Sequence, residues 1–126
     1  MIAIIDIGIG NLGAIRNMLR KVGADSRITS DPADIRAADK LVLPGVGAFD
    51  HGMRALSESG LTTVLNEQVL DAKKPVLGIC LGAQLLGRRS EEGERSGLGW
   101  IDMDVIRFPR TPGLTVPHMG WNIVTP

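Results

Sequence analysis

The stretch Pro75-Val76-Leu77-Gly78-Ile79-Cys80-Leu81-Gly82-Ala83-Gln84-Leu85-Leu86 decides the fold, because two apolar runs in it are separated by a turn with flanking glycines. We interpret it as a buried strand over 76–79, a tight turn at Cys80 and a helix that continues to about Arg89. Such a turn holds a nucleophile above the end of a sheet in a strained backbone. The start of the helix also directs free N–H groups at the sulfur, which favours the thiolate. The pattern therefore predicts nucleophilic attack on a carbonyl carbon.

The chain before this stretch alternates apolar runs with amphipathic segments. Asn11 is suited to cap one helix, with Gly23 placed to end it, and Asp31-Pro32 is suited to begin another. We expect strands over 2–7, 25–29 and 40–43, and helices from Leu12, from Pro32, and over 49–58 and 61–72. This alternation predicts an α/β fold, a flavodoxin-like and mostly parallel sheet with helices on both faces. A ligand is then expected at the carboxyl ends of the strands.

The character of the chain changes after residue 90. Ser90–Gly97 is polar and is expected to be a loop, Asp104–Phe108 a strand and Pro109–Gly113 a turn region. The residues 121–124 resemble a further strand, but the sequence ends at Pro126 with no helix to cover it. We therefore expect a single domain over 1–126, of which the carboxyl-terminal part is missing.

Charge and composition exclude several classes of function. The 14 basic and 14 acidic residues give no net charge, which argues against a nucleic-acid or membrane partner. Apolar residues form 44% and charged residues 22% of the chain, as in soluble globular proteins. The single cysteine, the absence of a signal-peptide pattern and the lack of a long apolar run are typical of a cytoplasmic protein.

Two other glycine-rich segments each have a functional and a purely structural interpretation. Gly8–Gly13 matches G-x-G-x-x-G, and Asp31 lies at the distance of a ribose-binding acid, so a dinucleotide site is an alternative to a simple tight turn. Pro44–Gly47 follows a strand, and its N–H groups either form a plain turn or donate to an oxyanion. His51 and His118 have no spacing that marks them as a base for Cys80 or as metal ligands.

The residues around Cys80 resemble the nucleophile segment of class I (triad) glutamine amidotransferases. Four further segments resemble, more narrowly, the amidotransferase subunits of imidazole glycerol phosphate synthases: Asp6–Leu12, Leu43–Phe49, Gly97–Trp100 and Pro117–Asn122. The resemblance runs in order along essentially the whole chain.

The resemblance implies a set of roles for residues of this chain. It implies hydrolysis of L-glutamine and transfer of the ammonia to a (β/α)8-barrel cyclase subunit of a heterodimer in histidine biosynthesis, with no cofactor and no metal. The implied residues are Cys80 as nucleophile; Val46, Gly47 and Leu81 at the oxyanion hole; Gly45 and Gln84 at the substrate; and Asn11, Met119 and Trp121 at the partner interface.

The chain departs from the family pattern in two ways. Ala83 stands where the family usually has methionine, near the glutamine site. The family also continues past Pro126 to a segment that carries a catalytic histidine and glutamate. We therefore expect negligible glutaminase activity from these 126 residues alone, and a non-catalytic module that docks on the cyclase is an alternative to an enzyme.

Overall fold

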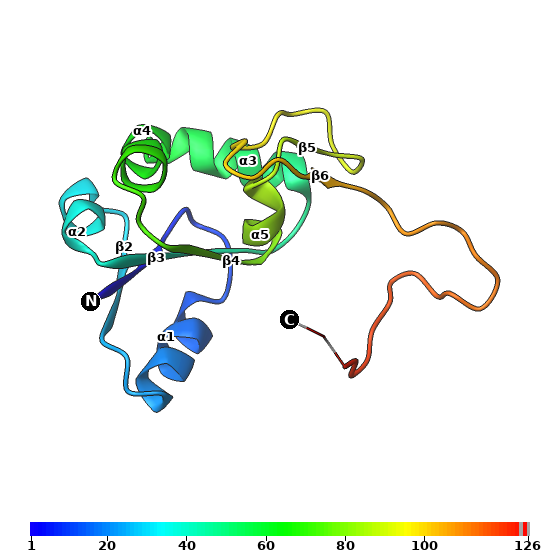
Figure 1. Ribbon diagram of the computed structural model, residues 1–126, viewed down its shortest axis with the longest axis horizontal. Helices are drawn as coiled ribbons and strands as arrows, with labels where there is room; N and C mark the ends of the chain where they lie inside the picture. The colour runs from blue at the N-terminus through cyan, green and yellow to red at the C-terminus, as the bar shows by residue number, and fades with distance from the viewer. Residues whose placement is uncertain (124, 126) are drawn as a thin grey trace.

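The computed structural model describes residues 1–123 and 125, and it contains the expected parallel sheet. The sheet order is β2-β1-β3-β4, and every neighbouring pair is parallel. Its strands are β1 (Ile2–Ile5), β2 (Ser26–Thr29), β3 (Lys40–Gly45) and β4 (Val76–Cys80). Helix α1 (Leu12–Lys21) lies on one face, and the other helices lie on the opposite face (Figure 1). These are α2 (Pro32–Ala37), α3 (Phe49–Glu58), α4 (Thr62–Asn66), its π-helical continuation η1 (Glu67–Asp71) and α5 (Leu81–Leu85).

The local signals at the helix ends act as the sequence predicts. The Asn11 side chain accepts the Ala14 N–H at 3.1 Å and caps α1. The Asp31 carboxylate accepts the Ala33 N–H at 2.8 Å and caps α2. Gly23 follows α1 with a φ of +76°, a left-handed conformation that ends the helix at little steric cost.

The two faces of the sheet are covered unequally. On the face of α2 to α5, a continuous core buries apolar side chains from the central strands β1 and β3 and from the helices that cover them. Among these side chains are Ile5, Leu43 and Leu65. On the face of α1, the side chain of Leu77 in β4 is 58% exposed. There an open apolar groove of about 390 Å³ runs between helix and sheet, lined by Ala14, Ile15, Met18, Leu19, Val22 and Ile79.

Several element boundaries differ from the prediction. Strand β1 ends at Ile5 instead of residue 7, and β3 runs on through Gly45. Helix α5 ends at Leu85 and does not reach Arg89, because the carbonyls of Leu85 and Leu86 accept N–H groups from the returning chain at residues 98 and 101. After it, Arg89–Ser90 forms the short strand β5, which pairs in parallel with β6 (Asp104–Val105).

The predicted strands near the carboxyl end are short or absent. Of Asp104–Phe108, only Asp104–Val105 is a strand, and residues 121–123 of the predicted strand 121–124 form none. Val124 lies outside the described residues. Trp121 and Ile123 are fully exposed on a segment that leaves the body after β6 (orange to red in Figure 1), so no neighbouring strand pairs with them. Every helix in the described part of the chain is too short or too polar to cross a membrane.

Candidate active site around Cys80

Cys80 lies at the predicted strand-to-helix junction: it is the last residue of β4, one residue beyond the predicted strand 76–79, and it immediately precedes α5. Its φ of 55° and ψ of −120° are those of the first central residue of a type II′ turn, a position dominated by glycine. A side chain in this conformation stores strain of about 1–3 kcal/mol, and such strain is found chiefly at functional sites. The residue is exposed, so the thiol is open to a substrate.

The turn at Cys80 is packed against the end of β3. Gly45 is the register partner of Cys80. A Cβ atom at Gly45 would lie 2.9 Å from the Gly82 backbone nitrogen and 3.1 Å from the Leu81 Cβ. A Cβ atom at Gly82 would overlap the Leu43 carbonyl oxygen. The end of β3 and the start of α5 thus touch through backbone atoms, which explains why glycine stands at both positions.

The segment after Gly45 continues toward the same end of the sheet. Val46 is half exposed, and Gly47 has a φ of +100°, in the left-handed region that favours glycine. Helix α3 then begins with Phe49, which is fully buried in a small cluster with Leu81 and Leu85. This cluster ties the helix after the Pro44–Gly47 segment to the helix after Cys80.

Gln84, one helical turn after Cys80, lines a cavity of about 750 Å³. Ala48, which follows Gly47, also lines it, and so do two arginines and Glu92. The complete lining is Ala48, Gln84, Glu92, Val105, Ile106, Arg107, Phe108, Arg110 and Val116. A carboxylate and guanidinium groups at one cavity match the opposite charges of a free amino acid. The sequence did not single out Glu92, because an acidic residue in a polar loop is ordinarily a solvated charge.

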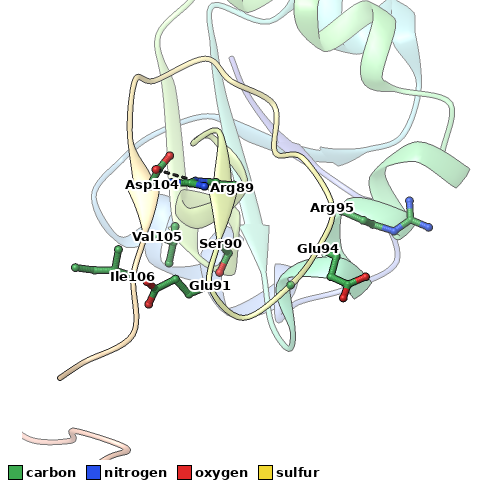
Figure 2. A pocket seen from close by; sticks show the side chains of 9 residues that line it. Arg89, Ser90, Glu91, Glu94, Arg95, Asp104, Val105 and Ile106 are labelled. Carbon is green, nitrogen blue, oxygen red and sulfur yellow. Dashed lines mark hydrogen bonds and ion pairs between the residues drawn. The ribbon is translucent and has the colours of Figure 1, made fainter. Parts of the chain in front are cut away.

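A second, smaller cavity of about 260 Å³ lies beside the β5–β6 pair and contains none of the predicted site residues (Figure 2). In it, Asp104 accepts hydrogen bonds of 2.9 Å from the Nε atoms of Arg89 and Arg88. These two hydrogen bonds hold the pKa of the Asp104 carboxyl below its usual value. Glu94 and Arg95 line the same cavity from the loop that follows β5 (Figure 2).

The remaining predicted residues lie apart from the thiol. In the part of the chain that the structure describes, neither histidine is hydrogen-bonded to Cys80: His51 is exposed on α3, and His118 Nε2 lies 3.4 Å from Asn122 Nδ2. Met119 and Trp121 are exposed on the extended segment after β6. Within residues 1–123 and 125, no group of three or more His, Cys, Asp or Glu side chains is arranged to hold a metal ion.

The glycines of Gly8–Gly13 lie at the same end of the sheet as Cys80. A Cβ atom at Gly10 would lie 3.5 Å from the Pro44 Cβ and 3.7 Å from the Gly45 backbone nitrogen. The Asp31 carboxylate, which the dinucleotide alternative would use for a ribose, is engaged as the cap of α2. Gly10 is thus packed closely against the end of β3, and the Asp31 carboxylate is occupied at the start of α2.

An exposed cysteine at a strained turn between a parallel strand and a helix, with glycine backbone packed beside it, is the arrangement expected from the resemblance to class I glutamine amidotransferases. The sequence pattern of that family, described as glutamine amidotransferase class-I, matches residues 3–125, and the chain belongs to this family.

Two curated relatives show which members it resembles. The chain is 57% identical over 126 residues to imidazole glycerol phosphate synthase subunit HisH 2 of Pseudomonas aeruginosa, covering 100% of this chain and 62% of the relative. It is 53% identical over 124 residues to subunit HisH 2 of Methanococcus maripaludis, covering 98% of this chain and 61% of that one. The chain thus spans about three fifths of the length of these relatives.

A solved structure supports the fold. A crystal structure described as a glutamine amidotransferase superposes with a TM-score of 0.71 at 19% identity, covering 84% of this chain and 56% of the other. At that identity the likeness concerns the fold alone, and it agrees with the predicted α/β class.

Proposed function

We propose that this chain is part of a glutamine-hydrolysing subunit that supplies ammonia to the cyclase of an imidazole glycerol phosphate synthase in histidine biosynthesis. The observation that carries the proposal is the backbone of Cys80, whose φ of 55° exposes the thiol at the end of β4, opposite Gly45. The similarity to the two HisH subunits supports the choice of pathway. The proposal includes a cytoplasmic heterodimer with a barrel-shaped cyclase and no nucleic-acid or membrane partner.

In the proposed reaction, the Cys80 sulfur attacks the side-chain carbonyl carbon of L-glutamine. The resulting oxyanion receives hydrogen bonds from the backbone N–H of Leu81 and from that of Val46 or Gly47. Cleavage of the C–N bond releases ammonia and leaves a glutamyl thioester. Water hydrolyses the thioester to glutamate and regenerates the thiol.

The α-ammonium group of the substrate is assigned to a residue of the cavity beside α5. Gly45 and Gln84 hold the glutamine, as the family resemblance implies. Glu92 lines the same cavity as Gln84 and carries the charge required by the α-ammonium group. The assignment of Glu92 rests on the cavity that it shares with Gln84 and on its charge, whereas that of Gly45 rests on the family resemblance.

We further infer that the 126-residue chain alone hydrolyses glutamine at a negligible rate. General-base assistance contributes about 10²–10⁴-fold to such reactions. Among the described residues, neither His51 nor His118 has a hydrogen bond to the thiol. Sustained ammonia release from glutamine by this chain with a cyclase partner, lost in Cys80→Ala, would contradict this inference.

The test of the proposed substrate is protection of Cys80 from alkylation. The probe is the analogue of L-glutamine in which a diazomethyl ketone replaces the side-chain amide; the sulfur bonds to the diazomethyl carbon, which gains the thiol proton as N₂ leaves. We expect labelling of Cys80, followed by intact-protein mass spectrometry, to saturate with the probe and to slow when L-glutamine is added. D-Glutamine should not protect. Labelling that rises linearly with the probe and ignores L-glutamine would refute the proposal.

A second candidate function is a docking module without catalysis. It is favoured by the exposure of Met119 and Trp121 on the segment after β6. Under this candidate, binding to a (β/α)8 cyclase, measured by pull-down, is lost in Trp121→Ala and retained in Cys80→Ala, while L-glutamine gives no protection of the thiol.

A further inference from the structure

Asp50, the second residue of α3, holds the backbone of a loop that is distant in the sequence. One of its carboxylate oxygens, Oδ1, accepts the Arg95 N–H at 3.0 Å. The Glu94 N–H lies 3.1 Å from both Oδ1 and Oδ2. Because donors on the loop converge on one ionised carboxylate, these hydrogen bonds belong to the stronger, charge-assisted kind.

The loop is shaped to receive this carboxylate. A Cβ atom at Gly93 would overlap Asp50 Oδ1, so only glycine lets the carboxylate reach the two N–H groups that follow. The backbone hydrogen bonds from Arg95 and Glu94 hold the pKa of the Asp50 carboxyl below its usual value. The side chain is therefore ionised at neutral pH.

The loop that Asp50 holds follows directly after Glu92. Glu92 lies directly before Gly93, and its own N–H is bound by the Oγ of the buried Ser90 at 3.1 Å. Ser90 thus fixes the loop on one side of Glu92 and Asp50 fixes it on the other. The Glu92 side chain lines the cavity that Gln84 also lines.

We propose that Asp50 is a positioning residue for glutamine, which holds the backbone of 93–95 so that the Glu92 carboxylate stays at the cavity beside Gln84. The inference rests on the proposed function, because it assigns the α-ammonium group of glutamine to Glu92. Asp50 itself does not touch the substrate. Asp50 lies in α3, three residues after Gly47. It therefore also connects the loop 93–95 to the helix that follows the proposed oxyanion segment.

The test compares two reagents for the same sulfur. The diazomethyl-ketone analogue of L-glutamine requires recognition of an amino acid, whereas iodoacetamide does not. For Asp50→Asn we expect the half-saturating concentration of the analogue to rise about tenfold, the factor that corresponds to one weakened charge-assisted contact. The rate of alkylation by iodoacetamide should stay unchanged.

Matched variants separate positioning from folding and from overall charge. Asp102→Asn removes the same charge from a residue that is largely exposed and pairs with Arg88, and it should leave both reagents unaffected. Asp50→Glu keeps the carboxylate and should recover part of the affinity, even if Asp50→Asn unfolds. Gly93→Ala displaces the same carboxylate from the loop side and should reproduce the tenfold rise.

The outcomes are distinguishable. If wild-type labelling saturates and is slowed by L-glutamine, but folded Asp50→Asn saturates at the wild-type concentration, the positioning role is wrong and the proposed function stands. A fall in the iodoacetamide rate that matches the loss for the analogue also overturns it, because the effect is then on the thiol. If the wild-type protein itself shows no saturation, the proposed function and this inference fail together.

Discussion

Replacing Cys80 by glycine should stabilise the fold, whereas replacing it by alanine should leave the stability nearly unchanged. The reason is the backbone conformation, a φ of 55° and ψ of −120°, which glycine adopts without the steric cost that any Cβ atom brings. The Cys80 side chain is exposed, so its removal takes away little packing. Alanine keeps the strain, and glycine releases it.

The magnitude follows from two opposing quantities. A side chain in a sparsely populated region costs about 1–3 kcal/mol. Glycine in ordinary secondary structure is less stable than alanine by about 0.5–1 kcal/mol, because its unfolded chain has more freedom. The difference leaves Cys80→Gly more stable than Cys80→Ala by about 1 kcal/mol, or roughly 4 °C in the melting temperature.

The assay is urea unfolding followed by the fluorescence of Trp100, which is partly buried and donates its indole N–H to Asn66 Oδ1 at 2.7 Å. The control is Ala55→Gly in α3, where the ordinary helical backbone predicts a loss of about 1 kcal/mol. At position 55 the glycine variant should be less stable than the protein with alanine. The reasoning would be refuted if position 80 showed the same order, with Cys80→Gly less stable than Cys80→Ala.

Three further predictions concern packing, association and pH. Gly82→Ala should destabilise the fold by about 1–3 kcal/mol or more in urea unfolding, since the new methyl group overlaps the Leu43 carbonyl oxygen; Gly13→Ala, with open space around the added Cβ atom, should gain about 0.5–1 kcal/mol, and equal effects would contradict the packing argument. We expect the isolated chain to self-associate through the open β4 edge, and Leu77→Glu to shift it toward monomer in sedimentation velocity; a wild-type chain that sediments as a monomer at every concentration would rule this out. The two arginine partners of Asp104 lower its pKa, so the stabilisation from that carboxylate is present above about pH 4 and is lost as the pH falls toward the lowered pKa. Asp104→Asn should therefore be less stable than wild type at neutral pH, and the difference in unfolding free energy should shrink below about pH 4. A difference that does not depend on pH would argue against the ion pairs of Asp104 with Arg88 and Arg89.

Features that depend on local chemistry could be predicted from the sequence. The caps at Asn11 and Asp31 and the end of α1 at Gly23 require only a side chain or a φ angle at one position, and all three are confirmed. The strained turn at Cys80 is confirmed as well. It was predictable because glycines two residues before and after Cys80 mark a backbone that must approach its neighbours closely.

Features that depend on distant partners could not. The pattern Leu81, Leu85 and Leu86 continues a helical stripe, yet α5 ends at Leu85. The Leu98 N–H bonds to the Leu85 carbonyl at 2.9 Å, and Ile101 bonds to that of Leu86 at 3.0 Å. These two N–H donors lie more than ten residues after α5 in the sequence, so the residues of the helix and its close neighbours do not reveal them. Periodicity also failed for residues 121–123, because a strand needs a neighbour to pair with.

The same distinction explains why the sequence did not single out Asp50 and Glu92, the two residues of the proposed loop contact. Asp50 in the first turn of α3 looks like a residue that merely complements the helix dipole. Only the fold brings Glu94 and Arg95 to it across 44 and 45 positions of sequence. Glu92 is likewise recognisable only once Gln84 is seen to line the same cavity.

The strain at Cys80 persists because the surrounding backbone leaves no alternative path. Gly78 lies before the turn and Gly82 after it; a side chain at Gly78 would overlap the backbone of Ala83 in α5, and one at Gly82 would overlap the carbonyl oxygen of Leu43 in β3. With β4 fixed to β3 in register and α5 fixed through Leu81 and Leu85 in the buried cluster with Phe49, the single residue between them must absorb the change of direction. That residue needs glycine's conformation, yet the chain has a thiol there. A position where the fold is over-determined and the residue type is unfavourable is where a chemical role is expected.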